Sequence, residues 1–450
     1  MTAALPRAFR WFWAGETVSG FGSWITMIAL QVIVVDHLHA GTVGVGWLNA
    51  ARWLPYLLFG LVLGALIDRV RRRPVMIGTD LVRALLLCAI PALWFTDLLD
   101  LSALVLLVAL LGTATLVNDS ASQAFLPRLV ARSSLQPAHA RIDGTNAAAE
   151  TAGPALGGAL LALISAPLAV LINVSTFLFS AIVVALIRVD EPRLPHAGAA
   201  SATPSGSAPP QQQEPRPPQS SPQPEPQSPP SKRRLGHEIA AGLRWVYSTR
   251  TLSDLAVWTH VWFAGQAILA AVTAVYFLSD IGLDTFSFGI VMGGSGLGGI
   301  AGALSSGAVG RRVGTGRTVI LAHICSAVGV LVLISAGLAA DGGTGNGRST
   351  AASAIILFTG MFLHGFGIGL SNSHEMAYRQ SITPDRFQAR TNTTMRSINR
   401  AVIVIVSPLA GFLAAATGTE FALVLAAAIF ALTAIGLWFS PFRTVRLDRG

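Results

Sequence analysis

Apolar residues along this chain collect in twelve long runs, separated by short polar segments rich in arginine. An α-helix needs about 20 mainly apolar residues to cross the hydrocarbon core of a bilayer, so each run predicts one membrane-spanning helix. The fold class that we expect is therefore all-α and integral to the membrane. Six runs fall in each half of the chain: 11–35, 44–66, 75–95, 102–124, 143–165 and 167–188, then 252–279, 286–309, 317–340, 350–373, 393–416 and 420–440.

The polar gap between the two sets of runs divides the chain. Residues 189–234 hold 13 of the 24 prolines together with serine and glutamine tracts, a composition that cannot build a core and predicts a disordered linker. At 235–250, apolar residues recur at helical spacing opposite charged ones, which predicts a short amphipathic helix on the membrane surface. We therefore expect a bundle over 1–188, the linker, the surface helix, and a second bundle over 251–450.

Composition and charge agree with a membrane protein. Hydrophobic residues make up 52% and charged residues 12%, which excludes a soluble globular domain, a disordered chain and a coiled coil. If the N-terminus is cytoplasmic, almost all basic residues fall in inside segments, and the outside loops carry Arg348 alone with seven acidic residues. This positive-inside pattern explains the net charge of +9 without a nucleic-acid partner. It places both termini and the linker in the cytoplasm, with the protein in the plasma or inner membrane.

The segment GALIDRVRRRP, 64–74, follows the second run and concentrates charge beside a glycine. A carboxylate among guanidinium groups can latch two helix bundles in one state and release them in another, although charge that only fixes topology gives the same pattern. The segment resembles the loop signature of the major facilitator superfamily, and a weaker copy at Gly307, Arg312 and Gly314 follows the eighth run. The matching positions of the first copy are Gly64, Asp68, Arg69, Arg72 and Arg73.

The fifth run carries TAGPALGGALL, in which Gly153, Pro154, Gly157 and Gly158 resemble a signature found in exporting members of that superfamily. Glycines four residues apart let another helix come close, and a proline bends its own helix. We expect this segment to pack on the glycine-rich run 286–309 and to seal one side of the membrane. Ordinary small-residue packing is the alternative. The segment SPLAG, 407–411, is the expected counterpart in the second half.

Ionisable and polar residues inside the runs are candidates for function because their burial in hydrocarbon is costly. A buried carboxylate can carry a coupling proton, or it can form a static pair with arginine. Glu150 shares a helix face with Gly153 and Gly157 and is the first candidate, whereas Glu16 and Asp119, near helix ends, favour the static interpretation. Arg52 is the one deep basic candidate. The set of candidate coupling and substrate residues is Glu150, Arg52, Asp119, Glu16, Asn146, His260 and Asn372.

The resemblance implies a secondary transporter that moves a small molecule by alternating access, and the 124–144 segment is most similar to siderophore and macrolide exporters. We therefore expect a monomeric, proton-coupled exporter of a small amphipathic molecule. An importer of a polar nutrient or organic anion on the same fold is the alternative. An enzyme is disfavoured, because the sequence has no Walker A lysine, no HExxH or Cys/His metal cluster, and no sign of a cofactor site.

Overall fold

The computed structural model describes residues 5–67, 70–189, 232–341 and 347–446. Thirteen α-helices and no strand occur in these residues, which confirms the all-α prediction. The linker expected at 189–234 lies almost entirely outside them. The helices are α1 Arg7–Val32, α2 Gly41–Ile67, α3 Arg72–Phe95, α4 Leu101–Leu129, α5 Leu135–Leu161, α6 Ala166–Leu186, α7 Lys232–Ser248, α8 Arg250–Val275, α9 Thr285–Val313, α10 Thr315–Asp341, α11 Gly347–Ile382, α12 Asp385–Thr417 and α13 Thr419–Phe439.

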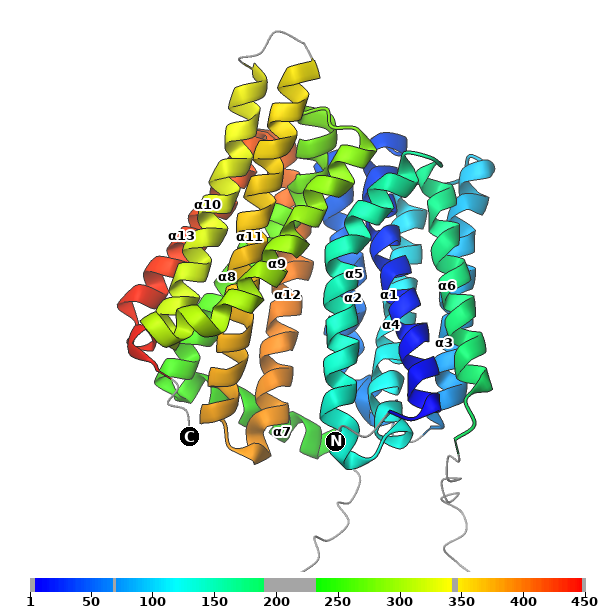
Figure 1. Ribbon diagram of the computed structural model, residues 1–450, viewed down its shortest axis with the longest axis vertical. Helices are drawn as coiled ribbons and strands as arrows, with labels where there is room; N and C mark the ends of the chain where they lie inside the picture. The colour runs from blue at the N-terminus through cyan, green and yellow to red at the C-terminus, as the bar shows by residue number, and fades with distance from the viewer. Residues whose placement is uncertain (1–4, 68–69, 190–231, 342–346, 447–450) are drawn as a thin grey trace, which may run out of the picture.

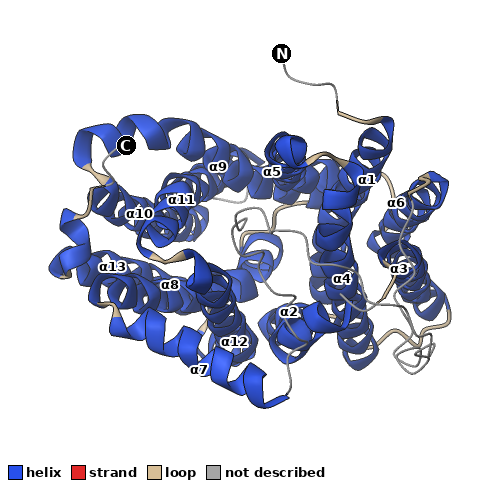
Figure 2. Ribbon diagram, turned by 90° about the horizontal axis from the view of Figure 1, so that it is seen from below, coloured by secondary structure: helices blue, strands red, loops and turns tan. Residues whose placement is uncertain are grey.

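Two bundles of six helices stand side by side (Figure 1). Helices α1–α6 form one bundle and α8–α13 the other, while α7 runs across one end along α8 and α12 (Figure 2). In the described residues, ten helices are long and apolar enough to cross a membrane. Helices α2, α5 and α7 fall outside that set. For α5 the reason is its polar first half, which includes Arg141 and Asp143, followed by Glu150 in the middle of the helix.

The two bundles meet through paired helices, α5 with α9 and α2 with α12. Gly158 lies so close to Gly289 that a Cβ on Gly158 would come within 2.6 Å of the Gly289 Cα atom. In the second pair, the Thr42 hydroxyl donates a hydrogen bond of 2.8 Å to the Gly411 carbonyl. These contacts close the end of the molecule opposite to α7, and they include the SPLAG segment that the sequence singled out.

Toward the end that carries α7, the helices of the two bundles diverge (Figure 1). A cavity of ≈ 430 Å³ opens there between α5, α9 and α11, lined among others by Glu150, Gly296 and Asn372. The molecule is therefore closed at one end and open at the other.

Candidate functional site

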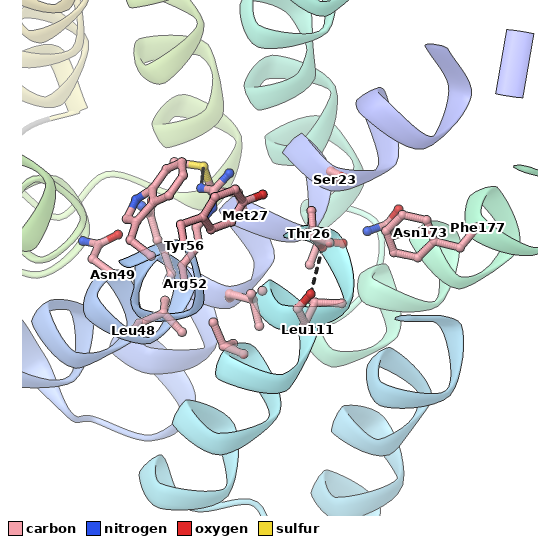
Figure 3. A pocket seen from close by; sticks show the side chains of 16 residues that line it. Ser23, Thr26, Met27, Leu48, Asn49, Arg52, Tyr56, Leu111, Asn173 and Phe177 are labelled. Atoms are coloured by element: carbon pink, nitrogen blue, oxygen red, sulfur yellow. Dashed lines mark hydrogen bonds between the residues drawn. The ribbon is translucent and has the colours of Figure 1, made fainter. Parts of the chain in front are cut away.

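The wall that the first bundle presents to the second is built on one face of α2. Arg52, Trp53 and Tyr56 fall on this face because positions three and four apart meet on a helix surface. Figure 3 shows Arg52 and Tyr56 turned into a cavity of ≈ 140 Å³ within this bundle. The Tyr56 hydroxyl donates a hydrogen bond of 2.8 Å to Asp119 Oδ2 on α4. The Arg52 guanidinium reaches Met27 Sδ on α1 at 2.9 Å.

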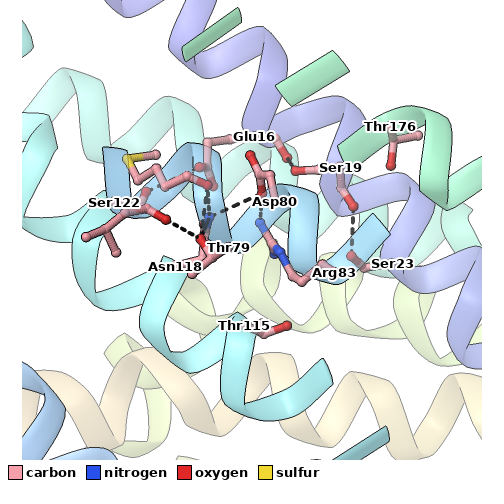
Figure 4. A network of polar contacts seen from close by, with 12 residues as sticks. Glu16, Ser19, Ser23, Thr79, Asp80, Arg83, Thr115, Asn118, Ser122 and Thr176 are labelled. Atoms are coloured by element: carbon pink, nitrogen blue, oxygen red, sulfur yellow. Dashed lines mark hydrogen bonds and ion pairs between the residues drawn. The ribbon is translucent and has the colours of Figure 1, made fainter. Parts of the chain in front are cut away.

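Behind this wall, polar side chains of α1, α3 and α4 form a connected cluster (Figure 4). Asp80 and Arg83 form an ion pair across one turn of α3, and the Asn118 amide donates a hydrogen bond of 3.2 Å to Asp80 Oδ1. The Ser122 hydroxyl donates a hydrogen bond of 3.3 Å to Glu16 Oε1. Asp119, Asp80 and Arg83 all lie close enough to Glu16 to interact with it electrostatically. The cluster thus gathers three carboxylates around one guanidinium group.

The facing wall of the second bundle is basic. A cavity of ≈ 400 Å³ lies between α8, α10, α11 and α12, and its ionisable side chains are one glutamate, one histidine and three arginines. Glu375 and Arg379 are spaced four residues apart on α11, while Arg396 and Arg400 are spaced four apart on α12. Trp262 and Phe263 of α8 supply aromatic surface to the same cavity.

Arg400 joins the two walls. Its guanidinium carbon lies 3.5 Å from the centre of the Trp53 ring, across the boundary between the bundles. Arg52 approaches the same ring at 5.1 Å. A guanidinium over an indole face is attracted by the ring quadrupole, and the attraction grows when water is excluded. The contact therefore couples α12 to α2 at the level of the candidate site.

The other predicted site residues are divided between several places. Glu150 and Asn372 line the opening between the bundles, and the side chain of Glu150 is exposed there and interacts electrostatically with Arg52. Asn146 lies one turn earlier on α5 and is also exposed. His260 is engaged within the second bundle: Nδ1 lies 2.6 Å from Asn399 Oδ1, and Nε2 lies 2.8 Å from the Tyr247 hydroxyl of α7.

Two expectations about these positions need correction. Asp119 and Glu16 are not close to helix ends, because α4 continues to Leu129 and α1 begins at Arg7. Arg52 is not the one deep basic residue, since Arg400 lies in the same wall contact. The apolar run 393–416 already contained Arg396 and Arg400, and their spacing of four was the available signal. Asp80 gave a similar signal, since it lies in the run 75–95 three residues before Arg83, whereas Tyr56 gave none.

The predicted loop signature is described only in part. Asp68 and Arg69 lie outside the described residues, and Gly64 falls near the end of α2. Arg72 is the first residue of α3. Arg73 follows it, and its guanidinium Nε donates a hydrogen bond of 3.1 Å to the Val184 carbonyl, with a second bond to the Ala185 carbonyl. Arg73 thus binds the exposed carbonyls at the end of α6, a favourable position for a cation.

The glycine segment of α5 serves two neighbours. Gly153 and Gly157 face Trp24 and Ile25 of α1, inside their own bundle. Gly158 instead meets α9 at Gly289, and a Cβ on Gly289 would lie 2.7 Å from the Pro154 carbonyl oxygen. The expected pairing with the run 286–309 is therefore present, but Gly158 and Pro154 make it, and Gly153 and Gly157 do not.

The sequence was compared with protein-family models and with known proteins. The family model described as Major Facilitator Superfamily matches residues 12–347 and 261–448. Macrolide efflux protein A of Streptococcus pyogenes is 28% identical over 186 residues, which are 40% of this chain and 44% of that protein. The multidrug efflux pump Tap of Mycolicibacterium fortuitum is 24% identical over 177 residues, 38% of this chain and 43% of that protein. The aligned stretch thus spans less than half of these relatives.

Solved structures match over nearly the whole chain. A bacterial homologue of the iron transporter ferroportin, in an inward-facing state, superposes with a TM-score of 0.70 at 14% identity, covering 98% of this chain and all of that one. The nucleoside transporter NupG superposes with a TM-score of 0.65 at 12% identity, covering 96% of this chain and 98% of that one. At these identities the likeness concerns the fold alone.

Proposed function

Because the chain belongs to the major facilitator superfamily and is a multi-pass membrane protein, we propose that it is a proton-coupled exporter of a small amphipathic molecule. The molecule would be a drug, siderophore or secondary metabolite, moved outward across the plasma or inner membrane by a monomer with both termini in the cytoplasm. Substrate and protons are its partners besides the lipid bilayer. The relatives named for macrolide and multidrug efflux support the outward direction.

The observation that carries proton coupling is the excess of carboxylates in the first bundle. Glu16, Asp80 and Asp119 all lie near the guanidinium of Arg83, and Asp80 already pairs with it. Asp119 also interacts electrostatically with Arg396 and Arg52, whereas Arg83 is the one cation found to act on Glu16 among the described residues. An unpaired carboxylate removed from water is costly, and binding a proton relieves that cost. Asp119 is in addition linked to the cavity wall, because it accepts the hydrogen bond from the Tyr56 hydroxyl. This link suits a coupling site. A movement of Tyr56 when substrate binds would therefore alter the hydrogen bonding of Asp119 directly.

In alternating access, the two helix pairs that join the bundles, α5 with α9 and α2 with α12, would together form one gate. The bundles rock about the binding site, so the contacts at Gly158 and Gly289 and at Thr42 and Gly411 separate while the opposite end closes. Arg400 would follow α12 in that movement and would leave or regain the face of Trp53. Proton binding at Asp119 and substrate binding on the walls would bias the same two states.

An importer of an organic anion remains the second candidate, since the arginines of the second wall suit an anionic ligand. Proteoliposomes separate the two directions, with the compound that deletion of the gene makes accumulate in cells or medium as the substrate. A proton antiporter takes up the compound when the vesicle interior is acidic, whereas a proton symporter does so when the exterior is acidic. Uptake that is indifferent to the pH gradient contradicts proton coupling.

A further inference from the structure

The arginines on α11 and α12 outnumber the carboxylates that lie near them. The described lining of their cavity holds the guanidinium groups of Arg379, Arg396 and Arg400 with the single carboxylate of Glu375. Arg396 lies near enough to both other arginines to repel them electrostatically. Like charges held together disfavour their charged forms unless an anion joins them. Asp119 of the first bundle also interacts electrostatically with Arg396, so the three guanidinium groups still outnumber the carboxylates near them.

These guanidinium groups also have unused hydrogen-bond donors. The Nε atoms of Arg379 and Arg400 are buried and have no acceptor among the described residues. The side-chain partners found for the terminal nitrogens of Arg379 are methionine sulfurs, Met395 and Met376, both at 3.6 Å. Sulfur is a weak acceptor, and an arginine fork is matched by a carboxylate, sulfonate or phosphate oxygen pair. The donors are thus in place for an oxyanion that the protein itself does not supply.

Aromatic surface lies beside these donors. Trp262 and Phe263 line the same cavity, with ring centres 5.0 Å apart, and Trp53 lies across the bundle boundary under Arg400. Such rings bind flat or apolar parts of a ligand. The amides of Asn392 and Asn399 add neutral polar groups to the lining. A ligand with an anionic head and an apolar body fits this combination.

From this arrangement we propose that the substrate carries an oxyanion group, bound by Arg396 and Arg400 with Arg379 beside them, and an aromatic or apolar body that lies between Trp262 and Trp53. The proposal deepens the proposed function by naming the substrate class, and it holds whichever way the substrate moves. Binding of the oxyanion would draw Arg400 from the face of Trp53. Substrate binding would in this way change the contact between α12 and α2.

The test is equilibrium binding of two fluorescent probes to the full-length protein in lipid nanodiscs, with empty nanodiscs subtracted. Dansylglycine carries a carboxylate on an aromatic body, and dansylglycinamide is its neutral counterpart. A charge-assisted hydrogen bond is worth roughly ten-fold in affinity or more, so dansylglycine should bind at least about ten-fold more tightly than the amide. No pH gradient is applied, so the result is independent of proton coupling and direction.

Matched variants locate the site. The double variant R396Q/R400Q should lose the preference for dansylglycine while it keeps its affinity for the amide, and Arg400→Lys should retain part of the preference because its charge remains. Arg244→Gln is the control, since this exposed arginine of α7 is not among the residues that line the cavity. Equal binding of the two probes by the wild-type protein, or no binding of either, overturns the proposal. So does a preference that survives in a folded R396Q/R400Q protein.

Discussion

Gly158→Ala tests whether the contact between α5 and α9 acts as a gate. The added methyl group would lie 2.6 Å from Gly289 Cα and 2.8 Å from the Thr285 carbonyl oxygen, whereas ordinary contact begins at 3.4 Å. Because these neighbours are backbone atoms, the helices must move apart. Overpacking of this kind costs about 1–3 kcal/mol. The cost applies only to the closed arrangement, since the helix preference of alanine over glycine is the same in both states.

A difference of about 1–3 kcal/mol shifts a two-state equilibrium by roughly 5- to 150-fold. The shift can be followed by pulsed electron paramagnetic resonance between spin labels at Gln123 and Gln380, exposed positions on opposite bundles, after Cys88 and Cys325 are replaced by serine. We expect the Gly158→Ala distribution to move toward shorter distances, because the opposite end closes as the gate opens.

The control is Gly144→Ala on the same helix, where an added Cβ meets nothing within 4 Å. Its distance distribution should equal that of the parent protein. If Gly158→Ala also leaves the distribution unchanged, the contact between Gly158 and Gly289 is simple packing and the gate lies elsewhere.

Three further predictions concern the walls and the linker. Tyr56→Phe removes the hydrogen bond to Asp119, so the free energy of unfolding should fall by about 1–3 kcal/mol and the transport rate by about ten-fold; a rate equal to wild type would separate Tyr56 from coupling. Glu150→Gln should leave the rate within about three-fold of wild type, because an exposed carboxylate is screened by water; complete loss would place the coupling proton on α5 instead. A tag at 200–220 should leave transport unchanged and react only with reagents on the cytoplasmic side, and labelling from outside would reverse the topology.

The helices could be predicted well because a bilayer demands long apolar runs, and each of the twelve runs corresponds to a helix. The ends of helices that extend beyond the hydrocarbon could not be predicted in the same way. Helix α5 begins at Leu135, eight residues before the apolar run, since a helix can continue into water once its polar residues leave the hydrocarbon. Hydropathy predicts the part of a helix that lies in lipid, but it does not predict how far the helix continues into water.

The same limit explains what the sequence missed at the site. Glu375 and Arg379 follow the end of the run 350–373, yet α11 continues to Ile382 and brings both side chains into the cavity. Asp119 and Glu16 were identified as candidates, but their partnership through Arg83 depends on three helices packing together. Contacts between helices, such as Arg400 on Trp53, are set by the tertiary arrangement and leave no local pattern.

The central claim is that the protein exports a small molecule with proton coupling through Asp119. Untargeted mass spectrometry of cells and medium, with and without the gene, tests it most directly, with complementation by the wild type and by Asp119→Asn. The account predicts a compound that is retained in the deletion strain, absent from its medium, and released again by the wild type but not by Asp119→Asn. A compound left unused in the medium of the deletion strain would contradict export, and release restored by Asp119→Asn would contradict the coupling site.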